Sequence, residues 1–154
     1  MGVDKPYELI EEITLEEEIG AIERDTEPDG RAYNFTKLKC LVIGMNSSGS
    51  NVFYTLTSNR LNKIPISIFS ISGSDASYRS LAEISCAGAI VVATGTNLPG
   101  FNVTQATMLS MYNVSPTICW PSGKIEGFIL RPQNAQSTAQ LMTGTKIMVY
   151  GVRA

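Results

Sequence analysis

The closing segment of the chain sets the strongest limit on its fold, because apolar and polar residues alternate along it almost to the last position. Thr145–Arg153 has the period-two pattern of a β-strand with one buried face. Chain ends usually fray unless a sheet holds them. A domain that uses these residues as a strand is therefore predicted to be a sheet from end to end.

Period two also dominates the rest of the 154 residues. Short strands with turn signals at intervals of about ten residues favour an antiparallel β-sandwich or jelly roll. Ser77–Ser85 also fits a short helix, but we favour a strand there. We predict one all-β domain over residues 1–154, with about ten strands. They are expected within Tyr7–Thr14, Ile19–Arg24, Phe35–Met45, Val52–Thr57, Lys63–Ser70, Ser77–Ser85, Ala87–Ala93, Ala106–Tyr112, Thr117–Trp120, Lys124–Leu130 and Thr145–Arg153.

The pattern within these strands assigns side chains to faces. Leu38, Cys40 and Val42 are expected to face one way, into the core. Tyr7, Leu9 and Ile13 are expected to share a face of the first strand. Pro65 cannot donate a hydrogen bond to a neighbouring strand, which places its strand at a sheet edge or makes it the first residue of the strand.

Charge is distributed unevenly along the chain. The first 30 residues carry eleven carboxylates against two basic residues, whereas the other 124 carry three carboxylates against ten basic residues. This asymmetry fits either an acidic arm that meets a basic partner or an acidic edge hairpin beside a weakly basic sheet, and we favour the hairpin. The ten basic residues are scattered singly, which argues against nucleic-acid binding. No segment is apolar enough to insert into a membrane.

The residue inventory argues against catalysis. The chain has no histidine, so the usual general base and the commonest metal ligand are missing. A carboxylate pair remains formally possible, but beyond residue 30 the candidates are Asp75, Glu83 and Glu126, which lie far apart in sequence. Three widely spaced cysteines form neither a disulfide framework nor a zinc pattern. We predict a non-enzymatic protein without a metal or another cofactor.

One acidic segment has a faint resemblance to a calcium loop. Asp25, Glu27 and Asp29 alternate and are followed by Gly30. The terminal bidentate glutamate of such a loop is missing at the required spacing, so we interpret the segment as a turn.

Aromatic and amide side chains are the other possible source of a binding site. A shallow saccharide site would combine aromatic faces with amide hydrogen bonds. The candidates are Trp120, Tyr112, Tyr78, Phe101, Asn97 and Asn102. A lone aromatic such as Trp120, at the end of a predicted core strand, can instead simply pack in the core, and for Trp120 we favour this interpretation. The loops in which to look are Asn46–Asn51, Ser72–Ser77, Thr94–Asn102 and Gln133–Gln140.

Two stretches near the beginning and one at the end of the chain carry a family resemblance. Tyr7–Glu18, Asp25–Lys39 and Gly144–Arg153 together resemble β-sandwich head domains of bacteriophage tail-fibre, baseplate and receptor-binding proteins. The resemblance covers about the first 45 and the last 12 residues. It implies that the two ends pair or lie side by side, and that the distal loops are free.

The resemblance also implies a role. It implies a virion protein made in the host cytoplasm that forms homo-oligomers, trimers above all, contacts other virion proteins and binds a saccharide on the host surface. A capsid-decoration or head-fibre subunit without a ligand is one alternative. A carbohydrate-processing enzyme without histidine is the other.

Overall fold

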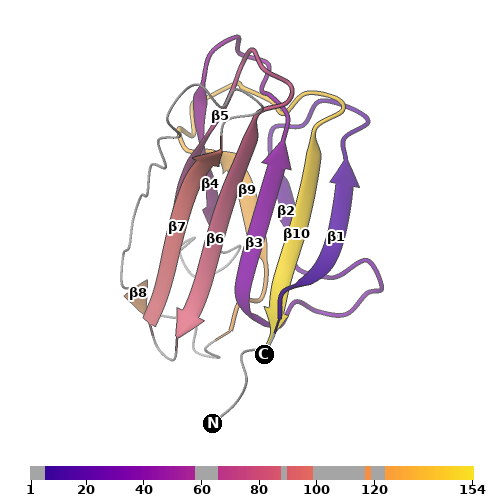
Figure 1. Cartoon of the computed structure of the whole chain (residues 1–154), viewed down its shortest axis with the longest axis vertical. Helices are drawn as coiled ribbons and strands as arrows, with labels where there is room; N and C mark the ends of the chain where they lie inside the picture. Colours follow the sequence, from indigo (N-terminus) through magenta and orange to yellow (C-terminus); the bar gives the residue numbers. More distant parts are fainter. Residues whose placement is uncertain (1–5, 58–65, 88–89, 99–116, 119–123) are drawn as a thin grey trace.

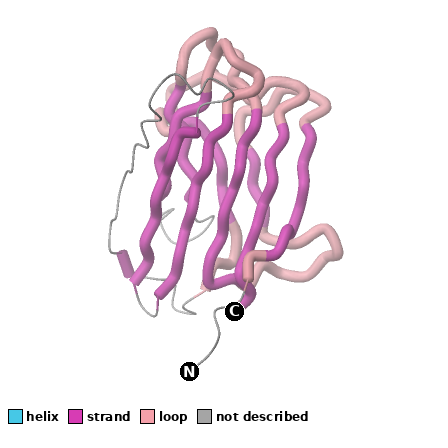
Figure 2. Tube along the Cα trace, in the orientation of Figure 1, coloured by secondary structure: helices cyan, strands magenta, loops and turns pink. Residues whose placement is uncertain are grey.

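The computed structural model describes residues 6–57, 66–87, 90–98, 117–118 and 124–154, and these residues form two antiparallel β-sheets (Figures 1 and 2). The described part contains no helix, and hence none that could cross a membrane. The predicted all-β class is confirmed. The strands are β1 (Glu8–Thr14), β2 (Ile22–Arg24), β3 (Phe35–Ile43), β4 (Val52–Thr57), β5 (Ile66–Ile71), β6 (Arg79–Ala87), β7 (Ile90–Leu98), β8 (Thr117–Ile118), β9 (Phe128–Pro132) and β10 (Lys146–Arg153).

The larger sheet has the order β1-β10-β3-β6-β7-β8, and the smaller sheet has the order β2-β9-β4-β5. The last strand lies between β1 and β3, so the expected pairing of the two ends of the chain is confirmed. β5 is an edge strand, as the proline in its predicted segment indicated, although Pro65 itself lies outside the described residues. The predicted strand Ala106–Tyr112 lies outside them too.

One hydrophobic core is shared by the two sheets. Leu38, Cys40 and Val42 point into it from β3 as predicted, and Tyr54 and Leu130 enter it from the smaller sheet. Burial raises the pKa of the Cys40 thiol well above its usual range. Cys40 is thus a small apolar core residue, as the alternation indicated.

A β-bulge overturns the predicted face of Leu9. The register of β1 against β10 shifts between Leu9 and Glu11, which adds one residue to β1 and exchanges its two faces. Leu9 is therefore 53% exposed, whereas Ile10 and Ile13 pack against the core.

The predicted acidic edge hairpin is wrong, because β1 and β2 belong to different sheets. Each is an edge strand, and an ion pair of 3.2 Å between Glu11 and Arg24 joins them. Several of the early carboxylates are paired with basic residues of the same chain, including Glu8 with Arg153. The charge asymmetry is thus partly neutralised within the chain.

The connections separate into two ends of the molecule. The loops that follow β1, β3, β5 and β9 lie together at the top of Figure 1, and we call this the loop end. β1 begins and β10 ends at the opposite end. Part of one predicted loop is wrong: residues 94–98 belong to β7 and pair with β6.

Candidate ligand-binding loops

The structure locates two of the predicted ligand-binding residues. Tyr78 is half-buried directly before β6, and its backbone NH donates to the Asp75 carbonyl at 3.2 Å. Burial raises the pKa of its phenol. Asn97 belongs to β7, where its backbone pairs with Ser80. These two positions are therefore at the same, upper end of the β6–β7 pair. Trp120, Tyr112, Phe101 and Asn102 lie outside the described residues.

Three of the predicted loops meet at the loop end. The backbone NH of Asn46 donates to the Ser72 carbonyl at 2.8 Å, and that of Ser47 donates to the Gln140 carbonyl at 2.8 Å. Gly73 lies so close to the backbone of Ser50 that a Cβ on this glycine would overlap it. The β3–β4, β5–β6 and β9–β10 loops thus form one packed surface.

Asn46 is the centre of this surface, although its side chain is buried. Its amide group donates to the carbonyls of Ser50 at 3.0 Å and Ile71 at 2.8 Å, and its side-chain oxygen accepts from the NH of Ser48 at 2.8 Å. Buried amides of this kind hold loops in one conformation, because each lost bond would leave a polar group unpaired. Asn46 is therefore a structural residue beneath the loop surface.

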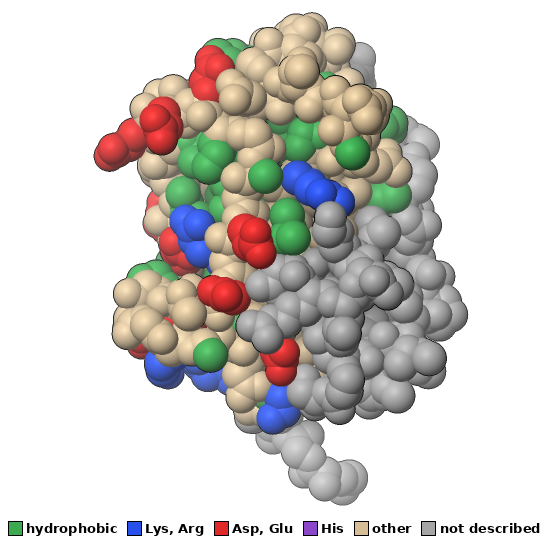
Figure 3. All heavy atoms as spheres, turned by 180° about the vertical axis from the view of Figure 1, so that it is seen from behind, with side chains coloured by type: hydrophobic (Ala, Val, Ile, Leu, Met, Phe, Trp, Pro, Cys, Tyr) green, Lys and Arg blue, Asp and Glu red, His purple; other side chains and the backbone are tan. Residues whose placement is uncertain are grey.

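The surface above Asn46 is polar and almost uncharged. In segments 46–51, 72–77 and 133–140, Asp75 is the single charged residue. Its carboxylate accepts hydrogen bonds from the backbone NH and the hydroxyl of Ser77, at 2.9 and 2.7 Å, which lowers its pKa. In Figure 3, uncharged side chains and backbone dominate the loop end, and carboxylates gather toward one side.

An open groove adjoins these loops at the edge of the smaller sheet. It has a volume of about 530 Å³ and runs between Gly20 and Ala21 on one side and segment 131–140 on the other. Among the described residues of its lining Arg131 is the charged one, and Asn134 and Gln140 line the groove too. Sequence reasoning missed Arg131 because it looks like an ordinary outward-facing residue of an alternating strand.

Phe53 is a second residue that sequence reasoning missed. Its neighbour Tyr54 is fully buried, whereas the Phe53 side chain is 52% exposed on the outer face of β4. The Gln133 NH donates to the Phe53 carbonyl at 2.9 Å, and Thr55 pairs with Arg131. Phe53 is therefore the diagonal neighbour of Arg131 on one sheet face.

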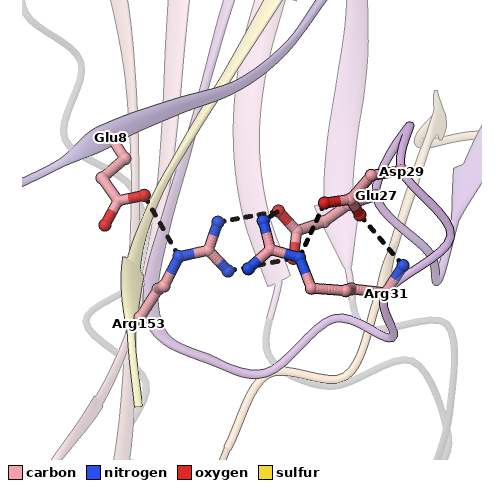
Figure 4. A network of polar contacts seen from close by, with 5 residues as sticks. All are labelled: Glu8, Glu27, Asp29, Arg31 and Arg153. Carbon is pink, nitrogen blue, oxygen red and sulfur yellow. Dashed lines mark hydrogen bonds and ion pairs between the residues drawn. The ribbon is translucent and has the colours of Figure 1, made fainter.

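The acidic turn near Gly30 is confirmed as a turn and is held by arginines (Figure 4). The Gly30 NH donates to the Glu27 carbonyl at 2.9 Å. The buried Glu27 carboxylate accepts two bonds from Arg153, at 2.8 and 2.9 Å, and these bonds lower its pKa. Arg31 pairs with Asp29 at 2.7 Å. Within the described residues, no group of three or more acidic, Cys or His side chains is arranged to hold a metal.

The three carboxylates considered for hydrolysis lie on separate elements. Asp75 is in the β5–β6 loop, Glu83 is on β6, and Glu126 precedes β9. Glu83 accepts a hydrogen bond of 2.7 Å from the Tyr7 hydroxyl. Burial of the phenol, and after it this hydrogen bond, raise the pKa of Tyr7.

Comparisons of this chain with protein-family models, with curated proteins and with solved structures found no match. The resemblance to phage head domains therefore stays a prediction.

Proposed function

We propose that this protein is a non-enzymatic β-sandwich head of a bacteriophage tail or receptor-binding protein, which adheres to host-surface saccharide through its loop end. The observation that carries the proposal is the packed cluster of three nearly uncharged polar loops (β3–β4, β5–β6 and β9–β10) at the end opposite to the start of β1 and the end of β10; the neighbouring β1–β2 loop, by contrast, carries Glu16, Glu17 and Glu18. A shaft joined near either of those positions would leave the loop end facing outward.

We further propose that the sandwich is a jelly roll. Four antiparallel pairs are nested along the chain: β1 with β10, β2 with β9, β3 with β6, and β4 with β5. The first and third pairs adjoin in the larger sheet, and the second and fourth adjoin in the smaller one. This order supports a long hairpin, made of the eight strands of these four pairs, that is rolled into two sheets. Strands β7 and β8 are additions that extend the larger sheet beyond β6. Jelly rolls are frequent among viral capsid and lectin domains.

The described loops favour adhesion by a preformed surface. The hydrogen bonds of Asn46 join the backbones of two loops, and Ser47 bonds to a third. A surface that is already ordered loses little conformational entropy on binding. Its Ser, Asn, Gln and Thr side chains supply donors and acceptors that match sugar hydroxyls.

A trimer would raise a weak single-site affinity through multivalency. The outer face of the larger sheet offers a surface for a second copy of the chain. Leu41 pairs with Met148 on one side and with Leu81 on the other, so three half-buried apolar residues form a row across the strands. Such a row is suited to the apolar centre of an interface between subunits.

The test combines solution mass with binding to purified bacterial cell walls and a glycan array. We expect a trimer that binds wall material, and we expect Asn46→Ala to weaken that binding while Glu12→Gln, on edge strand β1, leaves it unchanged. A folded oligomer that ignores walls and glycans would favour the decoration-subunit alternative. Glycan turnover by the purified protein that is lost in Asp75, Glu83 or Glu126 alanine variants would favour the enzyme alternative.

A further inference from the structure

We propose that the groove beside β9 is the saccharide site, and that Arg131 selects a sugar bearing an anionic group, either a carboxylate or a phosphate. This inference rests on the proposed function, because it assigns a ligand class and a location to the same adhesive activity.

The first argument is the state of Arg131. In the described part of the chain, Arg24, Arg31 and Arg153 each form an ion pair with a carboxylate. Arg131 forms no ion pair with any described residue, although it lines a groove. A guanidinium presents a planar fork of donors that fits a carboxylate or a phosphate with two parallel hydrogen bonds. No described carboxylate therefore occupies the guanidinium donors of Arg131.

The second argument is the composition of the groove wall. Its described lining contains amide and hydroxyl side chains, including Asn134, Thr138 and Gln140, and none of these described lining residues is a carboxylate that would repel an anion. Gly20 and Ala21 are small, and a Cβ on Gly20 would meet no atom within 4 Å. The volume of about 530 Å³ falls within the usual range for ligand pockets. The groove thus has space, neutral hydrogen-bonding groups and one cation.

The third argument is the exposed ring of Phe53. The ring lies on the same sheet face as Arg131, displaced along the neighbouring strand. Aromatic rings supply a large apolar contact area on which the C–H face of a sugar packs. Phe53 is not part of the groove lining, so a charged substituent held by Arg131 and a second sugar unit against Phe53 would together orient an oligosaccharide that leaves the groove and crosses from β9 to β4.

The binding test compares an anionic saccharide with its uncharged ester and adds a second anionic probe of a different chemical class. Isothermal titration would compare tetragalacturonate with its fully methyl-esterified, neutral form, and a glycerol-phosphate oligomer would represent the phosphate source. We expect the protein to prefer at least one anionic probe by more than tenfold over the neutral ester. Arg131→Gln should abolish that preference, and Arg131→Lys should restore only part of it. The identity of the preferred anionic probe tells carboxylate from phosphate.

Two further variants test the groove itself and control for the loss of a positive charge elsewhere. Ala21→Trp fills the groove without changing its charge and should weaken binding of every probe. Lys146→Gln removes one positive charge from the first residue of β10, at the loop end of the larger sheet, and should leave the preference unchanged. Far-UV circular dichroism checks that each variant is folded.

Failure of this inference can be told from failure of the proposed function. Equal affinity for the acid and ester forms, or an unchanged preference in Arg131→Gln, would overturn the inference. If the same variants still bound cell walls like the unmodified protein, the adhesive function would stand without this site. Absence of any wall binding by the unmodified protein would overturn both.

Discussion

Glu27 and Arg153, which are 126 positions apart, form a bidentate ion pair of 2.8 and 2.9 Å that joins the β2–β3 turn to the last strand. The guanidinium also lies 5.4 Å from the centre of the Phe35 ring. Glu27 is buried, so its charge depends on this partner. The pair therefore stabilises the end of the molecule at which β10 finishes.

The pair predicts a pH dependence of stability. Because its folded-state pKa is lowered, the Glu27 carboxylate stabilises the fold above its usual pKa of about 4.3, and this contribution is lost as the pH falls through the lowered value. Glu27→Gln should lower the free energy of unfolding by about 1–3 kcal/mol at pH 7. Urea unfolding should show that the difference in free energy of unfolding between the unmodified protein and Glu27→Gln becomes smaller as the pH falls from 7 to 2.5. A difference in free energy of unfolding that stays the same at every pH would contradict the prediction.

Glu12→Gln is the matched control for that experiment. Glu12 and Lys146 form an exposed pair of 3.8 Å, and such pairs contribute about 0–1 kcal/mol. The Glu12→Gln variant should therefore have nearly the same free energy of unfolding as the unmodified protein at every pH.

Gly151 is predicted to tolerate no larger residue. A Cβ at this position would lie 2.7 Å from the Phe35 ring, which is itself fully buried. Gly151→Ala should lower the free energy of unfolding by about 1–3 kcal/mol through overpacking. Gly20→Ala is the control, because its Cβ meets open space, and it should be neutral. Equal thermal midpoints for the two variants would show that Phe35 can move aside.

Asn46→Ala should loosen the loop end. The change removes three hydrogen bonds and leaves the buried Ile71 carbonyl without its side-chain donor, which costs about 2 kcal/mol. Hydrogen exchange should rise in segments 46–51 and 72–77 and stay unchanged in β3 and β10. Ser48→Ala, on the exposed part of the same loop, should change stability by less than about 0.5 kcal/mol. Uniformly faster exchange would instead indicate general destabilisation.

Tyr33→Phe is predicted to stabilise the protein. The Tyr33 ring packs edge-on against Phe35 at 5.1 Å, but its buried hydroxyl has no hydrogen-bond partner among the described residues. Removing this hydroxyl while keeping the ring should raise the free energy of unfolding by about 1 kcal/mol. Tyr150→Phe, at a half-buried position, should have a smaller effect. A loss of stability in Tyr33→Phe would reveal a hydrogen bond made by this hydroxyl.

Local alternation accounts for the part of the fold that could be predicted. The bounds of β4 coincide with the predicted Val52–Thr57, and β3 has the predicted inward face, because periodicity reports burial one strand at a time. The bulge near Leu9 could not be predicted, since an inserted residue depends on how β10 pairs with β1. Sheet membership also depends on distant partners, which is why β1 and β2 were wrongly joined in a hairpin.

Less of the candidate site than of the fold could be predicted from the sequence. Loop composition correctly identified three of the segments that meet around Asn46, because polar residues without periodicity indicate loops. The Arg131 groove arises from Gly20, Ala21 and segment 131–140, which are separated by more than 100 positions. A single arginine in an alternating strand gives no sign of such a neighbour.

The position of β10 between β1 and β3 has a consequence for how the molecule is made. Until residues 146–153 have left the ribosome, two strands of the larger sheet have a gap where their shared neighbour belongs. The pairings of β10 with β1 and β3 join distant parts of the chain, which makes folding slow compared with helical domains of the same size. Completion of the fold must therefore follow synthesis of the C-terminal strand, and a ribosome stalled before it would hold a chain with two unpaired strand edges.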